Sequence, residues 1–430
     1  MNLSKVPSIE DLRQIYERRT PRMFYDYCDT GSYTTSTYLD NTAAFAKYKL
    51  RQRVAVNIDG RKLNTTMVGQ PVSMPVAFAP IGSGGMQHAD GEIHACRAAQ
   101  KAGLPYTLST MSICSIEEVA KNVDKPFWFQ LYVMRDREFS KRLVARAKAA
   151  KCSALVLTLD LQILAQRHKD VKNGLSSPPK LTLPNILNMM TKPAWCWGML
   201  ATKNRQFGNI VGHAKDVSDI ASLNEWANHQ FDQTLDWSSV EFIRKLWDGK
   251  LILKGINDVE DAKIAAKLGA DAIIVSNHGG RQLDGASATI DMLGPIIDAV
   301  GDKVEVHFDS GIRTGMDVLK AIALGAKGTY IGRAYIYGLG AAGEAGVTRA
   351  IDIIRSELDT TMALCGETDI MKVGRQNLIM PVPSHYLPDD RRAEPTLAAP
   401  HNFRLPPPDN TMVLDLKPAR VPAKSRKAKR

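Results

Sequence analysis

Eight short runs of β-branched and apolar residues alternate with helix-like segments over residues 75–333, and this alternation limits the fold more than any other feature. Strands that alternate strictly with helices form a parallel sheet, and eight is the number that closes into a barrel. We therefore predict an α/β fold of the (β/α)8 (TIM) barrel class over about residues 75–370. The predicted strands are Val76–Ala79, Tyr106–Leu108, Phe127–Leu131, Ala154–Thr158, Leu251–Lys254, Ala272–Val275, Val304–Phe308 and Gly328–Ile331.

Helical periodicity fills the intervals between these runs. Apolar residues recur every three or four positions in Gly91–Lys101, Arg137–Ala150, Val259–Leu268 and Met316–Leu324, as they do on the buried face of a helix. Gly325 follows the last of these segments, where glycine commonly ends a helix. Each helix is expected to return the chain to the start of the next strand, and a further helical segment is expected before the barrel.

One connection is far longer than the others. About ninety residues separate Thr158 from Leu251, whereas most connections need only a few residues. We predict an insertion over about residues 161–250 that covers the active-site end of the barrel. Its segment 183–200 is apolar, rich in Met and Trp, and flanked by lysines. Two interpretations stay open for this segment: contact with a membrane interface, or packing on the barrel or on a neighbouring subunit.

The last fifty residues differ in composition from the rest of the chain. Residues 381–430 hold ten of the 22 prolines and ten Lys or Arg against five Asp or Glu, and so supply +5 of the net charge of +11. Such a segment cannot bury enough apolar surface to fold. We predict a disordered basic tail after one domain of residues 1–380. Basic tails bind anionic lipid or nucleic acid, but a solvated tail is the simpler interpretation, and no specific nucleic-acid partner is predicted.

The remaining composition is that of a globular enzyme, with 44% apolar residues to form a core. The six cysteines form no C-x-x-C pair, which argues against a metal centre or disulfide framework and favours a reducing compartment. The first residues, 1–7, lack the apolar run of a secretory signal, and no stretch reaches the roughly 18 apolar residues of a spanning helix. A cytoplasmic protein is therefore expected.

Reactive residues stand where four consecutive strands end. Parallel strands place their C-terminal ends at one face of a barrel, which is where barrel enzymes have their active sites. Residues of this kind at four neighbouring strand ends must share one cleft. They are Lys254, His278, Arg281, Asp309, Arg313 and Arg333.

The last two strand ends predict an anion site. Gly311 and Gly332 let backbone N–H groups approach an anion, and Arg313 and Arg333 add charged donors. In barrels, the loops after strands seven and eight commonly bind a phosphate, so we expect a phosphorylated cofactor or substrate. The glycine-rich run 82–85 lacks the G-x-G-x-x-G spacing, which argues against a dinucleotide-binding fold.

Taken together, these residues resemble the family of FMN-dependent 2-hydroxy-acid oxidases and dehydrogenases, which includes glycolate oxidase and the lactate-oxidising flavocytochromes. The resemblance covers about residues 5–374 and rests most on the string S-N-H-G-G-R-Q-L-D-G at 276–285. Further strings, at 50–53, 128–133, 309–313 and 362–366, are similar to those of bacterial respiratory L-lactate dehydrogenases. The resemblance implies bound FMN and oxidation of an L-2-hydroxy acid, with L-lactate favoured, to the 2-oxo acid.

The resemblance also implies roles for individual residues. His278 looks like the base that takes the hydroxyl proton of the substrate, and Asp160 like the carboxylate that orients this imidazole. Arg167 and Arg281 resemble the pair that holds the substrate carboxylate, a task that suits the planar guanidinium. Two tyrosines complete the substrate-binding set, Tyr27 and Tyr132.

The expected cofactor contacts come from many strand ends. Lys254 would lie near the N1–O2 edge of the flavin, where its charge favours the anionic reduced ring. The other flavin contacts implied by the resemblance are Pro80, Ile81, Gly82, Ser109, Gln130, Thr158 and Ser276. The ribityl phosphate is expected at Asp309, Ser310, Gly311, Arg313, Gly332 and Arg333. Outside this set, His307 is interpreted as a hydrogen-bonded core residue, and His88 and His94 as non-catalytic.

The loop after the fourth strand departs from the family pattern. Members usually follow the strand-end Asp with Thr-Pro and place Gly-Arg before the substrate-binding Arg, but here 161–166 reads L-Q-I-L-A-Q. Asp160 and Arg167 keep their spacing without the rigid proline, so we expect a changed substrate preference or lower activity. Met111 stands where glycolate-type enzymes have a tryptophan, which leaves room for lactate or a longer hydroxy acid.

Acceptor and assembly follow from the resemblance alone. It implies electron transfer to a quinone or cytochrome and a homotetramer. The composition of 183–200 and of the basic tail adds the expectation of a peripheral position on the cytoplasmic face of the inner membrane, reached through either segment. Three alternatives stay open. They are an oxidase that passes electrons to oxygen, an FMN-barrel isomerase of a phosphorylated substrate, and a non-catalytic binding protein in which the tail matters most.

Overall fold

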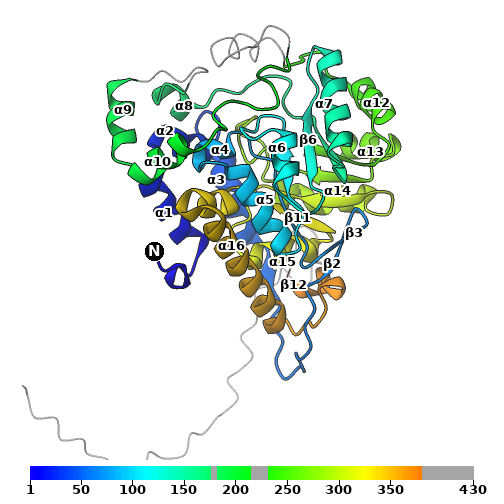
Figure 1. The fold of residues 1–430 in the computed structure, drawn as a ribbon. Coiled ribbons are helices and arrows are strands. Elements are labelled where there is room, and N and C mark those ends of the chain that lie inside the picture. The colour runs from blue at the N-terminus through cyan, green and yellow to red at the C-terminus, as the bar shows by residue number, and fades with distance from the viewer. Residues whose placement is uncertain (176–181, 215–230, 380–430) are drawn as a thin grey trace, which may run out of the picture. The chain divides into compact units, whose positions relative to one another are not determined.

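Eight parallel strands form a closed barrel (Figure 1). Hydrogen bonds join them in the order β4-β11-β10-β9-β8-β7-β6-β5, and a parallel bridge between Phe78 and Tyr106 closes the ring. All eight lie within two residues of their predicted bounds, and the prediction of a (β/α)8 barrel is confirmed. The strands are β4 (Val76–Phe78), β5 (Thr107–Ser109), β6 (Trp128–Tyr132), β7 (Ala154–Thr158), β8 (Lys250–Ile256), β9 (Ala272–Val275), β10 (Glu305–Phe308) and β11 (Gly328–Ile331).

The computed structural model describes residues 1–175, 182–214 and 231–379. The predicted tail, residues 381–430, lies outside these ranges, and so do two parts of the predicted insertion. Within the described ranges, no helix is both long enough and apolar enough to cross a membrane.

Helices cover the outside of the barrel between the strands (Figure 1). Two of them show why they begin and end where they do. Helix α15 starts with a capping box of Thr314 and Asp317 and ends at Gly325, whose φ of 116° is left-handed. Helix α13 starts at Asp258, whose side chain accepts two backbone N–H groups of the first turn. The series is α5 (Gly91–Lys101), α6 (Ile116–Lys121), α7 (Arg137–Ala149), α12 (Trp237–Leu246), α13 (Val259–Lys267), α14 (Thr289–Val300), α15 (Gly315–Leu324) and α16 (Arg333–Leu364).

The two-residue period of the strands decides which side chains reach the active-site end. Buried hydrophobic residues fill the barrel interior, namely Met67, Val68, Val72, Ala77, Ala79, Trp128, Ala154, Val156, Ile252, Ala272, Ile274 and Tyr330. Thr158, Lys254 and Ser276 each stand two positions beyond a member of this interior core. Because alternate residues of a strand share one face, these three polar residues continue the same interior column at the C-terminal ends.

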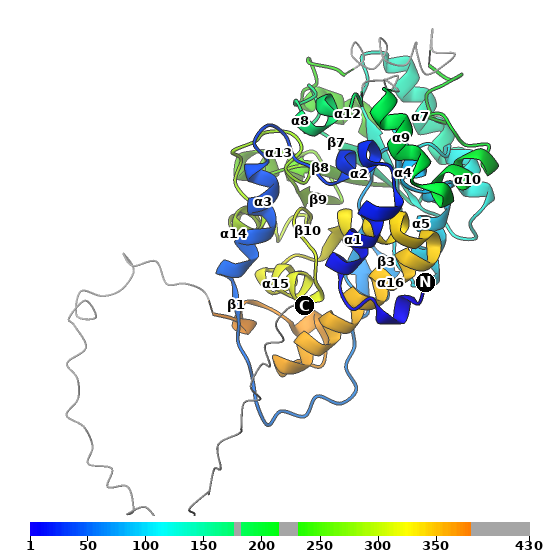
Figure 2. The same ribbon diagram turned by 90° about the vertical axis from the view of Figure 1, so that its left-hand side faces the viewer.

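The N-terminal segment packs on the last barrel helix, and it contains α1 (Ile9–Arg19), α2 (Arg22–Cys28) and α3 (Ser36–Ala43). Helix α1 lies beside α16 (Figure 2), with Tyr16 fully buried. The Asp284 side chain, in the loop after β9, accepts hydrogen bonds from Thr34, Ser36 and Thr37. This carboxylate therefore holds the N-terminal segment next to the loop that carries His278.

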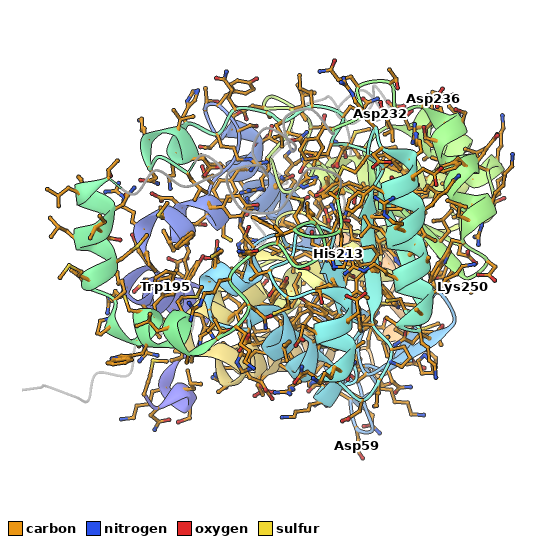
Figure 3. The ribbon with its side chains drawn as sticks, turned by 45° about the horizontal axis from the view of Figure 1, so that its top comes forward. Asp59, Trp195, His213, Asp232, Asp236 and Lys250 are labelled. Carbon is orange, nitrogen blue, oxygen red and sulfur yellow. The ribbon has the colours of Figure 1, made fainter. Side chains whose placement is uncertain are left out.

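The predicted insertion contains the barrel's own fourth helix as well as extra elements. Helix α12, with Val240 and Ile243 buried in the main core, leads into β8, so the extra residues end near Asp236. The added helices are α8 (His168–Lys172), α9 (Leu183–Met190) and α10 (Pro193–Ala201). Trp195 of α10 stacks on Phe24 of α2 with 5.4 Å between ring centroids, so this part of the insertion packs on the N-terminal helices (Figure 3).

The remaining elements are small. The hairpin of β2 and β3 inserts Met67 into the interior core near Gly328, at the N-terminal end of β11. A second antiparallel pair, β1 with β12, joins the two flanks of the barrel sequence. Their bounds are β1 (Lys49–Leu50), β2 (Thr65–Met67), β3 (Gln70–Val72) and β12 (Leu378–Ile379), and the short α4 spans Gly84–Gln87.

Candidate active site

A cavity of about 570 Å³ opens at the C-terminal ends of the strands. Seventeen of the twenty residues for which the sequence predicts a role line its wall. The other three lie one layer behind, and each is hydrogen-bonded to a residue of the wall. The pairs are Asp160 with His278, Gln130 with Ser109, and Ser276 with Lys254.

The imidazole of His278 is held by a carboxylate. Its Nδ1 lies 2.8 Å from Oδ1 of Asp160, and the two side chains are only 18% and 14% exposed. The backbone at His278 is left-handed, with φ of 59°, and its N–H donates to Ser276 Oγ at 3.2 Å. Because Nδ1 is engaged by an anion, this nitrogen carries the proton and Nε2 is left to accept one.

Burial and charge set the protonation of this pair. Burial lowers the pKa of His278, although the charge and hydrogen bond of Asp160 oppose the shift. Burial would raise the pKa of Asp160, but its hydrogen bond with His278 and the charge of Lys254 outweigh this effect, and the pKa lies below its usual range. At neutral pH the imidazole is therefore unprotonated beside an ionised carboxylate, which is the state that a general base requires.

Two neighbouring residues hold the loop that departs from the family pattern. The side-chain amide of Gln282 donates to the backbone carbonyls of Asp160 and Ile163, both at 2.8 Å. Gly255, at the end of β8, has φ of 101°, and a Cβ there would lie 2.6 Å from Cγ of Asp160. Hydrogen bonds from Gln282 thus hold the loop on one side, and a glycine leaves room for Asp160 on the other.

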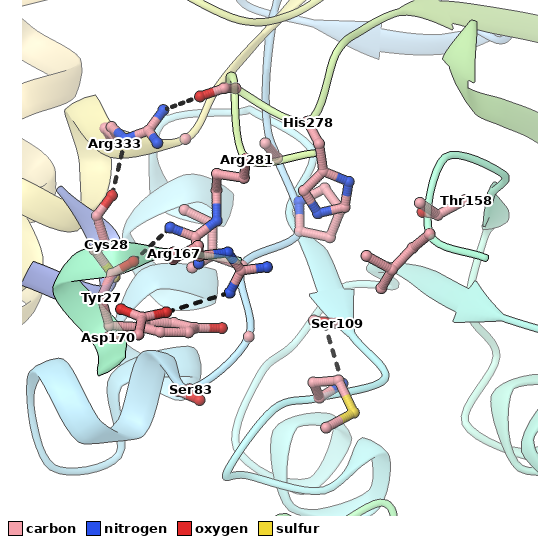
Figure 4. A pocket seen from close by; sticks show the side chains of 18 of the residues that line it. Tyr27, Cys28, Ser83, Ser109, Thr158, Arg167, Asp170, His278, Arg281 and Arg333 are labelled. Carbon is pink, nitrogen blue, oxygen red and sulfur yellow. Dashed lines mark hydrogen bonds and ion pairs between the residues drawn. The ribbon is translucent and has the colours of Figure 1, made fainter. Parts of the chain in front are cut away.

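Two guanidinium groups meet over the ring of Tyr27. The Cζ atoms of Arg281 and Arg167 lie 4.7 and 5.9 Å from the ring centroid, and Arg281 also donates to the Tyr27 carbonyl (Figure 4). Arg167 is 12% exposed, and burial together with the charge of Arg281 lowers its pKa. The paired donors can bind one carboxylate with bidentate geometry.

A buried ion pair lies beside the base. Lys254 Nζ is 3.2 Å from Asp309 Oδ2 and donates to Ser276 Oγ at 2.9 Å. Burial would lower the pKa of Lys254, but the charges of Asp309 and Asp160 raise it. The ammonium therefore stays charged at the bottom of the cavity.

Buried polar atoms without partners test whether a flavin fits. Among the described residues, Gln130 Nε2 and Thr158 Oγ1 are buried without a hydrogen-bond partner, and such atoms are rare unless a ligand completes them. A Cβ at Gly82 would lie 3.2 Å from that of Met111, so this position of the cavity wall has little room for a side chain. A planar ring that carries hydrogen-bond donors and acceptors on its edge fits beside Gln130, Thr158 and Lys254.

The residues predicted to bind the phosphate lie together in the structure, and one of them has a second role. Residues 309–313 and Gly332-Arg333 line the same end of the cavity. Arg313 lies over the ring of Tyr337, 5.8 Å from its centroid. Arg333, however, donates to the carbonyls of Cys28, Gly279 and Thr30. Its guanidinium therefore also fastens the N-terminal segment to the barrel, a role that the sequence does not predict.

Some lining residues were not predicted from the sequence. Asp170 is the only carboxylate besides Asp309 among the described residues that line the cavity, and its spacing of three from Arg167 was the available signal. No local pattern indicated the apolar part of the wall, which includes Phe24, Leu161, Leu164, Phe207 and Phe231. In contrast, His307 is fully buried between Tyr330 and Glu305, as a core histidine should be.

The fold and the site define a barrel enzyme with a histidine base, paired arginines and a place for a phosphorylated planar cofactor. A family model described as FMN-dependent dehydrogenase matches residues 16–380. The chain belongs to this family, and its cofactor is FMN.

Curated relatives cover nearly the same length. The L-lactate dehydrogenase of Ectopseudomonas mendocina (strain ymp) is 43% identical over 370 residues, which are 86% of this chain and 97% of the relative. The L-lactate dehydrogenase of Caulobacter vibrioides (strain NA1000 / CB15N) is 42% identical over 380 residues, 88% of this chain and 99% of the relative.

Solved structures of the same architecture include enzymes named for an aromatic hydroxy acid, mandelate. The (S)-mandelate dehydrogenase described as a monotopic membrane protein superposes with a TM-score of 0.84 at 33% identity, over 88% of this chain and 100% of that one. A mandelate oxidase variant with (S)-mandelic acid gives a TM-score of 0.73 at 33% identity, over 88% and 99%.

Proposed function

We propose that this enzyme oxidises an L-2-hydroxy acid, with L-lactate favoured, to the 2-oxo acid. One observation supports this above the others: the Asp160–His278 pair and the Arg167–Arg281 pair face one cavity beside the residues that fit FMN. A base and two carboxylate-binding arginines in one cavity suit a molecule whose hydroxyl and carboxylate are on adjacent carbons. The lactate dehydrogenases among the relatives support the same substrate.

Binding orients the substrate. Arg167 and Arg281 hold its carboxylate, and the hydroxyls of Tyr27 and Tyr132, which both line the cavity, donate to it. Both guanidinium groups are poorly hydrated in this wall, so a bound carboxylate replaces water that they hold weakly. The fixed carboxylate directs the adjacent hydroxyl toward His278.

His278 Nε2 then takes the hydroxyl proton. The imidazolium that forms is stabilised by Asp160 at 2.8 Å, which holds the ring in the required tautomer. FMN supplies the two-electron acceptor for the α-hydrogen. Lys254, charged and buried, places positive charge at the far edge of the ring site, where reduction adds negative charge.

The cofactor is proposed to lie against the wall from β4 round to β11. The ring would be held by Pro80, Ile81, Gly82, Ser109, Gln130, Thr158, Lys254 and Ser276. The phosphate would be held by Asp309, Ser310, Gly311, Arg313, Gly332 and Arg333, with backbone N–H groups near the start of α16 as further donors.

Anaerobic reduction tests the proposal. L-lactate added without oxygen should bleach the flavin absorbance of the purified protein, while D-lactate should not. Parallel titrations with glycolate and (S)-mandelate rank substrate size, because the apolar wall could also accept a larger side chain. If no 2-hydroxy acid bleaches the bound flavin, the proposed activity is wrong.

The acceptor is proposed to be a quinone or cytochrome rather than oxygen. Mixing the lactate-reduced protein with air or with a soluble quinone analogue, and timing the return of the flavin colour, separates these cases. Faster reoxidation by air would make the enzyme an oxidase. A homotetramer is also proposed, and its mass can be measured by light scattering.

We further propose that α9 and α10 rest on the surface of a membrane. Five large apolar side chains there are each more than half exposed, namely Leu183, Leu187, Met190, Trp197 and Leu200. Several large apolar side chains exposed on two neighbouring helices are typical of an interaction site. The similarity to (S)-mandelate dehydrogenase, which is described as a monotopic membrane protein, supports a membrane as the partner.

A further inference from the structure

One carboxylate faces the substrate arginines and has no role in the proposed chemistry. Asp170 lies in the first turn of α8, three residues after Arg167, and its Oδ2 is 3.6 Å from Arg167 NH1 (Figure 4). The two side chains are 14% and 12% exposed, so little water separates them. Asp170 also lines the cavity that would receive the substrate.

The contact between Asp170 and Arg167 is incomplete. At 3.6 Å it is an ion pair without the distance of a strong hydrogen bond. Within the described part of the chain, Asp170 Oδ1 and Arg167 Nε are both buried and have no hydrogen-bond partner. Burial raises the pKa of Asp170, although Arg281 and Arg167 lower it. Each group thus has a hydrogen-bonding atom without a partner, and both residues line the cavity.

The charged residues that line the cavity can be grouped by the residue or ligand that each one pairs with. Lys254 is paired with Asp309, and Arg313 and Arg333 stand at the proposed phosphate end. Arg167 and Arg281 remain for the substrate, and Asp170 is the carboxylate beside them. Arg205 also lines the cavity, but it is exposed and its guanidinium donates to the carbonyls of Thr202 and Leu200. Of the buried charges beside the substrate site, two cations and one anion leave a single positive charge, which matches a ligand with one carboxylate.

We propose that Asp170 is the resident counter-ion of Arg167 and restricts this site to hydroxy acids with a single carboxylate. The inference rests on the proposed function, because it requires that the substrate carboxylate binds Arg167 and Arg281. Before the substrate enters, Asp170 holds the Arg167 guanidinium in place. A substrate carboxylate then accepts hydrogen bonds from Arg167. A second carboxylate on the substrate would be repelled by Asp170, because little water is present there to screen the two charges.

The repulsion gives a quantitative test. Coulomb energy is proportional to ligand charge. The factor by which removing Asp170 changes the dissociation constant of a dianion should therefore be the square of the factor for a monoanion. At this spacing and an effective dielectric between protein and water, we expect Asp170→Asn to tighten pyruvate binding about threefold and oxalate binding about tenfold. The dissociation constants can be measured from the change that each ligand causes in the visible spectrum of the oxidised holoenzyme.

Two variants serve as controls. Asp170→Glu keeps the charge and should leave both dissociation constants within about twofold. Asp26→Asn removes a carboxylate on the neighbouring α2 that is already paired with Lys169 at 3.2 Å and Arg22 at 3.3 Å, so it should change neither constant more than about twofold. If Asp170→Asn does not retain FMN, Asp170→Ser is the neutral replacement.

Steady-state kinetics give a second measurement. With Asp170→Asn, the ratio of kcat/KM for L-malate to that for L-lactate should rise about threefold, mainly through KM. Equal tightening of pyruvate and oxalate, no tightening, or the same effect in Asp26→Asn would overturn the role of Asp170. If L-lactate fails to bleach the wild-type flavin, the proposed function fails instead, and the two failures are distinguishable.

Discussion

Asp160 and His278 are joined across an intervening strand. Asp160 follows β7 and His278 follows β9, while β8 lies between them in the sheet. Their 2.8 Å contact passes over the end of β8, where the chain has Gly255. The position that a Cβ would take there is 2.6 Å from Asp160 Cγ. The contact between Asp160 and His278 therefore requires a residue without a side chain at position 255.

Gly255→Ala should therefore disable the site. The new Cβ would push Asp160 away from His278, and we expect kcat to fall about 100-fold or more. Gly269→Ala is the matched control because Gly269 also has a left-handed φ, of 73°, but has nothing within 4 Å of the added Cβ. The control should lose about 1 kcal/mol of stability and keep its turnover. Similar turnover in both variants would argue against this geometry.

His278→Gln should bind FMN and remain yellow but lose reduction by L-lactate. Removal of a general base commonly slows the chemical step by about 10²–10⁴-fold. Stopped-flow measurement of flavin bleaching without oxygen checks the rate directly. The absorption spectrum before substrate addition controls for cofactor loss, and reduction at a near-normal rate would exclude His278 as the base.

The pH profile should respond to Asp160. The base must be unprotonated, so kcat/KM should fall as pH drops through the pKa of His278, which burial holds below its ordinary value of about 6.5. Asp160 opposes that shift, so Asp160→Asn should move the acid limb to still lower pH while the maximal rate falls about 100-fold or more. A limb that moves to higher pH would contradict the assignment.

The Lys254–Asp309 pair should matter for stability. Lys254→Met leaves the buried Asp309 carboxylate without its cation at 3.2 Å, and breaking a buried pair on one side costs about 3–5 kcal/mol. Asp309→Asn in the same chain should recover part of this loss because no unpaired charge remains. Urea unfolding of the single and double variants gives the comparison, and a double variant less stable than Lys254→Met would contradict it.

Membrane binding should depend on α9 and α10. We expect Leu187→Glu combined with Trp197→Glu to lower partitioning onto anionic vesicles at least about tenfold, because two exposed apolar side chains no longer enter the interface. Leu364→Glu is the control, since Leu364 is 57% exposed at the end of α16. Cosedimentation measures both. If the control loses as much partitioning onto vesicles as the double variant, or the double variant loses none, the membrane contact lies elsewhere in the protein.

The strands were predicted almost to the residue because buried parallel strands are short and apolar and their flanks are polar. The inserted helices were harder to delimit, since α12 belongs to the barrel although it follows the same long connection. Asp170 was missed although its spacing of three from Arg167 was a local signal. The apolar wall was missed because its residues come from distant parts of the chain, such as Phe24 and Phe207, and no local period marks them.

The sequence by itself determined the number and order of the strands, the ends at which reactive residues stand, and the family motif around His278. Those features are local, because a strand's period and the residues that follow it are written in consecutive positions. Only the tertiary structure decided that Gln282 holds the loop after Asp160, that Arg333 fastens the N-terminal segment, and that Asp170 lines the cavity. These contacts depend on how the loops fold over the barrel mouth, and a side chain's neighbours there are set by packing rather than by sequence spacing.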